Sequence, residues 1–184
     1  MKIAITGHSR GIGKALYEEL STNHEVEGFS RSNGYDITTQ QTLIARTVKK
    51  YDVFVNNAWQ GYAQLELLTA MFNTWKTDET KTIVNISSLS KYPGLTGNTT
   101  GYSATKAALS HQAFILMFKT DRKCRIININ PGFVETDMTQ NNPRVPVGTK
   151  MITPKECANA IAWAINQPQH IEIGELSIWR PYDK

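Results

Sequence analysis

The sequence has little of what secreted, membrane-spanning and metal-binding proteins require. Its 184 residues include only two cysteines, Cys124 and Cys157, which lie far apart and share no metal-ligand spacing with the four histidines. We expect both to be reduced thiols of a cytoplasmic protein. No apolar run reaches the length of a membrane span, and no positively charged leader precedes an apolar run. Neither membrane insertion nor a signal peptide is therefore expected.

Basic residues are in slight excess but are not clustered. Lysine and arginine number 20 against 16 aspartates and glutamates, and no basic stretch is longer than the pair Lys49-Lys50. Because nucleic-acid binding requires a concentrated basic patch, we expect no nucleic-acid partner. A composition of 40% hydrophobic and 20% charged residues is ordinary for a globular chain. Residues 1–184 contain no linker or repeat and are predicted to form one domain.

Short apolar runs alternate with longer amphipathic segments. Most of the runs are rich in valine and isoleucine and nearly continuous in apolar character, which is typical of strands buried on both faces. This alternation predicts an α/β fold with a doubly wound parallel sheet covered by helices on both faces. The predicted strands are Lys2–Thr6, Glu25–Ser30, Val53–Asn57, Thr82–Ser87, Arg125–Asn130 and Leu176–Trp179, and the predicted helices cover 11–22, 39–50, 63–76 and segments that begin near Tyr102 and after Thr153.

A glycine-rich loop with the sequence TGHSRGIG, residues 6–13, follows the first predicted strand and precedes the first predicted helix. Glycines allow a tight turn and a close approach of the backbone to a pyrophosphate, and a helix N-terminus supplies free N–H groups. A glycine triplet alone fits a simple turn equally well. Its position between a strand and a helix favours a dinucleotide site.

Two arginines bear on which dinucleotide would bind. An acidic residue at the end of the second strand would bind the 2′-hydroxyl of NAD, whereas an arginine accommodates the 2′-phosphate of NADP. Here Ser30-Arg31-Ser32 stands at that strand end, and Arg10 lies inside the glycine loop. Either arginine alone is explained by a solvated surface. Together they favour NADP(H) through charge and forked hydrogen bonds.

Tyr102 and Lys106 lie four residues apart, on one face of a predicted helix. A tyrosine with a pKa near 10 is a poor acid–base group at neutral pH, and a nearby cation would lower that pKa by stabilising the phenolate. Tyrosine and lysine have this spacing on many helices, so the pair alone is weak evidence.

Polar and glycine-containing segments follow several strands at the edge where open α/β sheets bind ligands. Ser87-Ser88 is one, and a hydroxyl there can donate to a substrate carbonyl. Asn56-Asn57-Ala58 and the segment 130–136, with the sequence NPGFVET, end two more strands. Their occurrence at one edge makes a catalytic site beside Tyr102 more plausible than a set of unrelated turns.

The ordered segments TGHSRGIG, NNA, NISS, YSATK and NPGFVET make the chain similar to the short-chain dehydrogenase/reductase family over nearly its whole length. The resemblance implies a three-layer Rossmann-like domain that transfers hydride between NADP(H) and a carbonyl or alcohol substrate. It implies that Tyr102 is the general acid or base, that Lys106 binds the nicotinamide ribose and that Ser88 orients the substrate. It assigns cofactor binding to Gly7, Ser9, Arg10, Gly11, Ile12, Gly13, Arg31, Asp36, Ile37, Asn57, Ala58, Pro131, Gly132, Val134 and Thr136, besides Tyr102 and Lys106.

Three segments depart from the family pattern. Between Arg31 and Asp36 there is no room for the usual helix and a full third strand, so we expect a truncated third-strand crossover with at most a vestigial strand near Tyr35-Asp36. The glycine that usually follows Asn-Asn-Ala is Trp59, and the asparagine of the catalytic tetrad has no clear match. Counting back from Ser88 leads to a position near Gln60. The substrate loop between Thr136 and Thr153 is short and carries Pro143 and Pro146.

The helix that begins near Tyr102 becomes apolar almost all round at residues 113–118. An exposed helix does not need apolar residues on its outer face, and in the resembled family this helix pairs across a two-fold axis. A homodimer or homotetramer is expected, with deep burial inside one subunit as the alternative. A dinucleotide-binding sensor with little turnover and a sugar-nucleotide-modifying enzyme are the competing functions.

Overall fold

A computed structural model describes residues 1–92, 101–140, 142, 145 and 147–181 of the chain. Six parallel strands form one sheet in the order β2-β1-β3-β4-β5-β6. All six predicted strands are confirmed, and each end lies within one residue of its predicted position. The strands are β1 Lys2–Thr6, β2 Glu25–Phe29, β3 Val53–Asn56, β4 Thr82–Ile86, β5 Arg125–Pro131 and β6 Glu175–Ile178.

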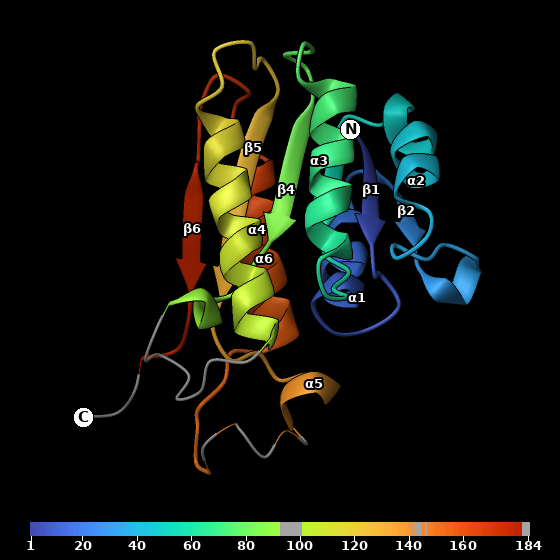
Figure 1. The fold of residues 1–184 in the computed structure, drawn as a ribbon. Coiled ribbons are helices and arrows are strands. Elements are labelled where there is room, and N and C mark those ends of the chain that lie inside the picture. Colours follow the sequence, from blue (N-terminus) through green and yellow to red (C-terminus); the bar gives the residue numbers. More distant parts are fainter. Residues whose placement is uncertain (93–100, 141, 143–144, 146, 182–184) are drawn as a thin grey trace.

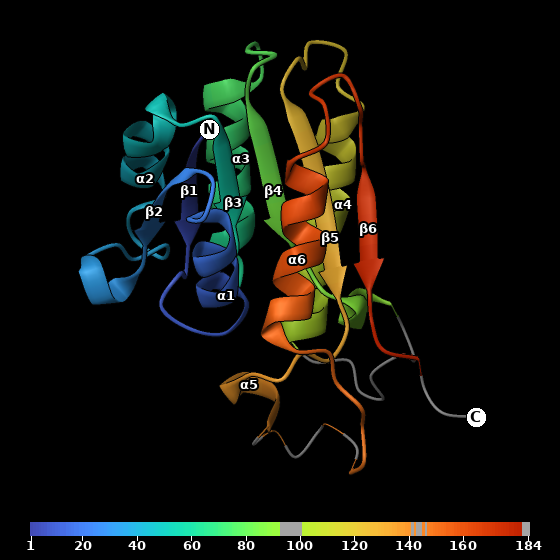
Figure 2. The same ribbon diagram turned by 180° about the vertical axis from the view of Figure 1, so that it is seen from behind.

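Helices cover both faces of the sheet, which confirms the three-layer, Rossmann-like architecture. The helices α2 Gln41–Thr47, α3 Ala63–Trp75 and α4 Gly101–Met117 cover the face seen in Figure 1. The helices α1 Gly11–Leu20 and α6 Pro154–Ile165 cover the opposite face, seen in Figure 2. The short helices are α5 Asp137–Gln140 and the 3₁₀ helices η1 Arg31–Asn33, η2 Val48–Lys50 and η3 Leu89–Lys91. None of the helices in the described ranges is long and apolar enough to cross a membrane.

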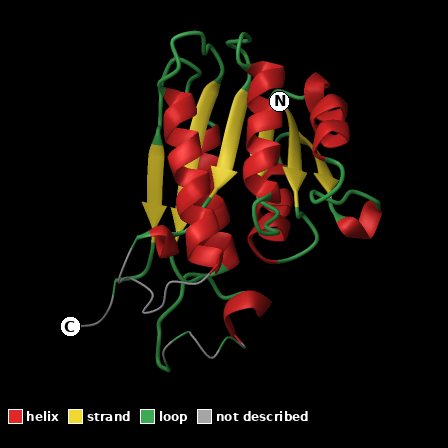
Figure 3. Cartoon of the chain, in the orientation of Figure 1, coloured by secondary structure: helices red, strands yellow, loops and turns green. Residues whose placement is uncertain are grey.

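Two apolar cores lie on opposite faces of the sheet because successive strand residues point to opposite faces. In β4, Ile83 packs with Leu67 and Leu68 of α3. Its neighbour Val84 packs in the other core with Leu16 of α1 and Ile161 of α6. Each fully buried aliphatic side chain of this kind contributes about 1.5–3 kcal/mol to folding. Figure 3 shows the strands enclosed between the two helical layers.

A row of amide side chains crosses the α3–α4 face of the sheet in register. Asn56 donates to Asn85 (Nδ2 to Oδ1, 3.1 Å), and Asn85 donates to Asn128 (2.9 Å). Asn128 in turn donates to Glu175 Oε1 of β6 (3.3 Å), and Glu175 forms an ion pair with Lys91 of η3. The three asparagines are buried, so these hydrogen bonds satisfy amide groups that would otherwise be costly inside the core.

The segment between β2 and α2 explains why the sheet ends at β2. The crossover is truncated as predicted, but Tyr35 and Asp36 belong to no strand, so the vestigial strand is absent there. The backbone instead reverses after η1, where Tyr35 N donates to Ser30 O (2.9 Å). Asp36 Oδ1 then accepts hydrogen bonds from both N and Oγ1 of Thr38 (2.8 and 2.7 Å). These local bonds replace the partners that a strand would have supplied.

The beginning of α6 agrees with its sequence signature. Thr153 Oγ1 accepts from Glu156 N (3.2 Å), and Glu156 Oε2 accepts from Thr153 N (2.7 Å), with Pro154 as the first helical residue. This capping box fixes the end of the substrate loop. Pro143 and Pro146 of that loop lie outside the described residues.

Candidate active site

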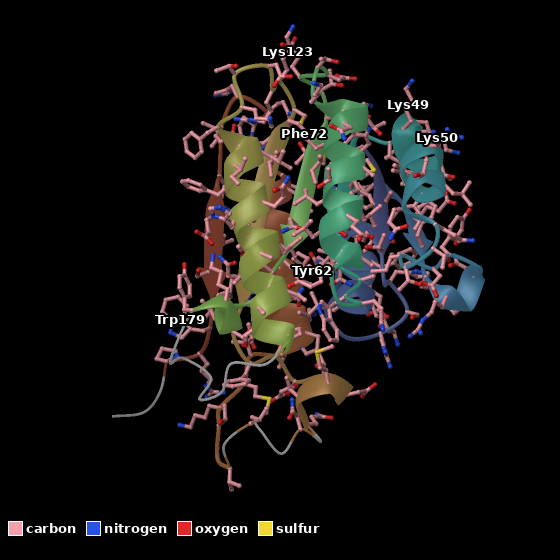
Figure 4. All side chains as sticks on the ribbon, in the orientation of Figure 1. Lys49, Lys50, Tyr62, Phe72, Lys123 and Trp179 are labelled. Carbon is pink, nitrogen blue, oxygen red and sulfur yellow. The ribbon has the colours of Figure 1, made fainter. Side chains whose placement is uncertain are left out.

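A cavity of about 820 Å³ lies at the carboxyl ends of the strands, where the segments after β1, β3, β4 and β5 converge. Every residue that the sequence singled out as catalytic or cofactor-binding lines this cavity. They are Gly7, Ser9, Arg10, Gly11, Ile12, Gly13, Arg31, Asp36, Ile37, Asn57, Ala58, Ser88, Tyr102, Lys106, Pro131, Gly132, Val134 and Thr136. Figure 4 shows Lys49, Lys50 and Lys123 at the opposite end of the sheet, so these lysines lie away from the cavity.

The glycine loop is shaped by close backbone approaches. Gly7 and Gly11 have positive φ angles of 69° and 54°, which favour glycine. A Cβ atom on Gly13 would lie 2.2 Å from Gly7 O, so α1 can pack this close to the loop only through a glycine. Asn57 Nδ2 donates to Thr6 O (3.0 Å) and Gly7 O (3.2 Å), which ties the loop to the end of β3.

The N-terminus of α1 fits a pyrophosphate group. The N-cap residue is Arg10, whose side chain forms no capping hydrogen bond, so it leaves the first N–H groups of the helix without a side-chain acceptor. These groups and the helix dipole favour an anion. The side chains of Arg10 and Arg31 are exposed, and both residues line the cavity. Hydrogen bonds from Thr38, aided by the charge of Arg31, hold the pKa of Asp36 below its ordinary value.

Lys106 is buried on the cavity side of α4. Its Nζ donates to Gln64 Oε1 and to Ile86 O, both at 2.8 Å, and lies 5.6 Å from the centre of the Tyr102 ring. The side chain is 3% exposed, and burial lowers the pKa of its amine to about 7. Burial therefore favours the uncharged form of the Lys106 amine more than it is favoured in an exposed lysine.

Tyr102 differs electrostatically from the sequence prediction. Burial raises the pKa of Tyr102 above its ordinary value, while a hydrogen bond with Ser88 acts in the opposite direction. The net shift is upward, opposite to the lowering expected from Lys106, whose amine donates to Gln64 and Ile86. Ser88 is held by Ser90, whose N and Oγ donate to Ser88 Oγ (3.1 and 3.0 Å).

Two neighbours of the Tyr102–Lys106 pair were not assigned from the sequence. Trp59 replaces the usual glycine, and its ring packs edge-on against Tyr102 with centroids 4.9 Å apart. Its Nε1 donates to Thr105 Oγ1 (3.1 Å), which fixes the indole against α4. Gln64, rather than Gln60, contacts Lys106. Gln60 is an exposed residue at the cavity wall that precedes α3, whereas Gln64 lies inside that helix.

The model of the family described as "short chain dehydrogenase" matches residues 45–145. The chain belongs to the short-chain dehydrogenase/reductase family. Among curated members, it is 34% identical over 108 residues to the serine 3-dehydrogenase of Agrobacterium fabrum, an alignment that covers 52% of this chain and 42% of that enzyme. The chain thus spans about two fifths of the length of the curated relatives that it matches first.

Solved structures of short-chain dehydrogenase/reductase proteins share the fold. A short chain dehydrogenase from Burkholderia cenocepacia in complex with NADP superposes with a TM-score of 0.78 and 20% identity, covering 96% of this chain and 86% of that one. The 3-alpha-hydroxysteroid dehydrogenase from a Pseudomonas species, complexed with NADH, gives a TM-score of 0.75 and 22% identity, with coverage of 97% and 95%. These structures agree on the architecture and differ in the dinucleotide that they hold.

Replacing Lys106 by methionine is expected to stabilise the fold at neutral pH. The amine has a pKa of about 7 when folded and an ordinary value of 10.5, so below pH 7 the folded state bears the full cost of a buried charge. That cost disappears as the pH rises from 7 to 10.5. Above pH 10.5 the Lys106→Met variant should be less stable than the wild type, because the hydrogen bonds to Gln64 and Ile86 are lost. Relative to that difference, its unfolding free energy should gain roughly 3–5 kcal/mol near pH 7. Denaturant unfolding across this pH range measures the difference.

Lys49→Met is the matched control, since Lys49 is an exposed residue far from the cavity. Its unfolding free energy should differ from that of the wild type by a small amount that does not change with pH. An equal response of both variants would show that Lys106 bears no burial cost.

Proposed function

We propose that this chain is an NADP(H)-dependent oxidoreductase that interconverts a carbonyl compound and an alcohol. The observation that carries the proposal is one cavity whose wall contains both the glycine loop and the group Ser88, Tyr102 and Lys106. The free N–H groups of α1 would hold the pyrophosphate, and Pro131 and Gly132 would lie beside the nicotinamide. NADP(H), when bound, supplies or accepts the hydride at nicotinamide C4.

The side chains of the site would donate a proton and a hydrogen bond to the substrate oxygen. The Tyr102 hydroxyl would donate its proton to the carbonyl oxygen during reduction. The Ser88 hydroxyl would donate a hydrogen bond to the same oxygen. Lys106 would bind the nicotinamide ribose. Trp59 restricts the Tyr102 ring through their edge-on contact and so orients the phenol.

Replacing Tyr102 by phenylalanine tests the reaction. We expect the wild type to oxidise NADPH when a panel of carbonyl compounds is supplied, and the Tyr102→Phe variant to lose at least about 100-fold in kcat because the proton donor is gone. NADPH affinity should change little, since the ring remains. Loss of absorbance at 340 nm follows turnover, and NADPH fluorescence follows binding. Tight NADPH binding by the wild type without turnover on a broad panel would favour the dinucleotide sensor instead.

We further propose that NADP(H) is preferred over NAD(H). Ser30 and Ser32 stand at the cavity edge where an acidic residue would serve NAD, and Arg31 and Arg10 supply positive charge there. The adenosine end would pass Asp36 and Ile37 at the truncated crossover.

The cofactor preference depends on Arg31 under this proposal. The Arg31→Ala variant should bind NADPH at least about tenfold more weakly, because a charge-assisted hydrogen bond to the 2′-phosphate is lost. Its affinity for NADH, which has no 2′-phosphate, should stay within about twofold. Calorimetric titration with both dinucleotides measures the two affinities, and tighter binding of NADH than NADPH by the wild type would refute the preference.

We also propose a cytoplasmic homodimer or homotetramer. Phe114 and Ile115 are exposed on α4 and Phe118 is exposed directly after it, and the rings of Phe114 and Phe118 pack together with centroids 4.8 Å apart. The alternative of deep burial within one subunit does not hold for these three residues. The two free cysteines, Cys124 and Cys157, are both buried.

Sedimentation at micromolar concentration tests the association. The wild type is expected to sediment as a dimer or tetramer, and Phe118→Glu should shift it toward monomer because a charge would enter an apolar interface. Lys119→Glu, a charge change on the neighbouring exposed residue, is the control. A wild type that sediments only as monomer would contradict the proposal.

A further inference from the structure

Gln64 occupies a buried position between the ends of two adjacent strands. It is the second residue of α3, its side chain is 1% exposed, and it does not line the cavity. Its Nε2 donates to Asn56 O (2.7 Å) and to Ile86 O (2.9 Å), the carbonyl groups of the last residues of β3 and β4. Its Oε1 accepts from Lys106 Nζ (2.8 Å).

The orientation of the Gln64 amide is fixed by these three contacts. Both N–H groups of Nε2 are used by backbone carbonyls that cannot donate. If the amide were flipped, Oε1 would face the two carbonyls and the NH₂ group would face the Lys106 amine. Both contacts to the backbone carbonyls would then be lost, and the ammonium form of Lys106 would lose its acceptor. The ends of β3 and β4 therefore direct the only acceptor of this side chain at Lys106.

The backbone of Gln64 is held to the same strand. Asn56 Nδ2 donates to Gln64 O (2.8 Å) as well as to Asn85 in the amide row. The first turn of α3 is thus anchored to β3 from both sides, because Asn56 and Gln64 each donate to the other's backbone carbonyl. This reciprocal pair makes Gln64 a rigid support.

The surroundings of Lys106 contain dipoles rather than counter-charges. Its own helix α4 presents the titratable side chain of Tyr102, and β4 presents the Ile86 carbonyl. Gln64 faces it from α3, and Asn56 of β3 lies behind Gln64. Among the residues that the structure describes, no carboxylate pairs with Lys106.

We propose that Gln64 is a positioning residue that holds the Lys106 amine at the cavity wall by a direct, uncharged hydrogen bond. Its consequence for turnover depends on the proposed oxidoreductase function, whereas the contact itself does not. A neutral acceptor orients the amine and leaves its proton weakly held. A carboxylate at the same place would bind the ammonium form much more tightly, and an apolar side chain would release the amine.

Titration of Lys106 in the cofactor-free protein tests the contact without any need for activity. NMR of ¹³C-lysine-labelled protein follows the side chain, with the signal assigned by its loss in Lys106→Met. In Gln64→Met, the Lys106 pKa should fall by about one pH unit, because the ammonium form loses an acceptor. In Gln64→Glu, it should rise by about one pH unit or more, because an opposite charge is added.

Gln60→Met is the matched control for this titration. It makes the same replacement shortly before α3, at an exposed side chain, and the Lys106 pKa should remain that of the wild type. Gln64→Glu places a carboxylate oxygen near the carbonyls of Asn56 and Ile86. If that variant does not fold, as judged by circular dichroism, the Gln64→Met titration decides alone. An unchanged Lys106 pKa in folded Gln64→Met would overturn the proposal.

A second measurement connects the contact to turnover. In Gln64→Met, kcat should fall about tenfold or more with little change in the KM of the carbonyl substrate, since Lys106 is displaced while the substrate wall is intact. The pH profile of kcat should move in the same direction as the Lys106 titration. If wild-type protein shows no turnover, the oxidoreductase proposal fails while the titration still tests Gln64. A fall in kcat with an unmoved pH profile would leave Gln64 a purely structural residue and overturn its positioning role.

Discussion

The common direction of the six strands is the constraint on which the site depends. Because every strand runs the same way, all carboxyl ends meet at one edge of the sheet, where the last carbonyl groups of β1, β3 and β4 accept hydrogen bonds from side chains. These groups are buried and need donors. Here the side chains of Gln64 and Asn57 supply several of them, and the same side chains hold Lys106 and the glycine loop. The same two side chains therefore satisfy backbone carbonyl groups and hold parts of the candidate site in place.

The hydrogen-bond network of the site continues into the core along the row of amide side chains. Asn56 belongs both to the support of Gln64 and to the row that runs through Asn85 and Asn128 to Glu175. The row ends at Lys91, three residues after Ser88, so it links the ends of β3 and β4 to the segment that carries Ser88. Such a network rigidifies a core when it is satisfied. Rigid support matters for side chains that must be placed within a fraction of an ångström of a reacting atom.

The sequence predicted the strands well because valine and isoleucine mark doubly buried strands, and the strand-end motifs located the cavity residues. Prediction failed where tertiary geometry decides. Counting back from Ser88 leads to Gln60, which precedes α3, and does not single out Gln64, the residue inside that helix that contacts Lys106, since spacing along a chain does not reveal where a helix begins relative to a strand end. Tyr35 and Asp36 form a turn because Thr38 and Ser30 offer local partners. The pKa of Tyr102 could not be read from its spacing to Lys106, as it depends on where the amine is directed and how deeply the ring is buried.

The truncated crossover leaves β2 as an outer strand, and outer strands are places where protein chains pair with one another and aggregate. Its exposed residues Glu25 and Glu27 lie on the same face of the strand. Two copies of this edge brought together would place carboxylates opposite carboxylates, an arrangement that opposes pairing. Glu27 also bonds to the Tyr51 hydroxyl and Glu25 pairs with Lys2, so both carboxylates are held close to the sheet. The truncated crossover thus exposes an edge strand whose two glutamates disfavour pairing with the same edge of another copy.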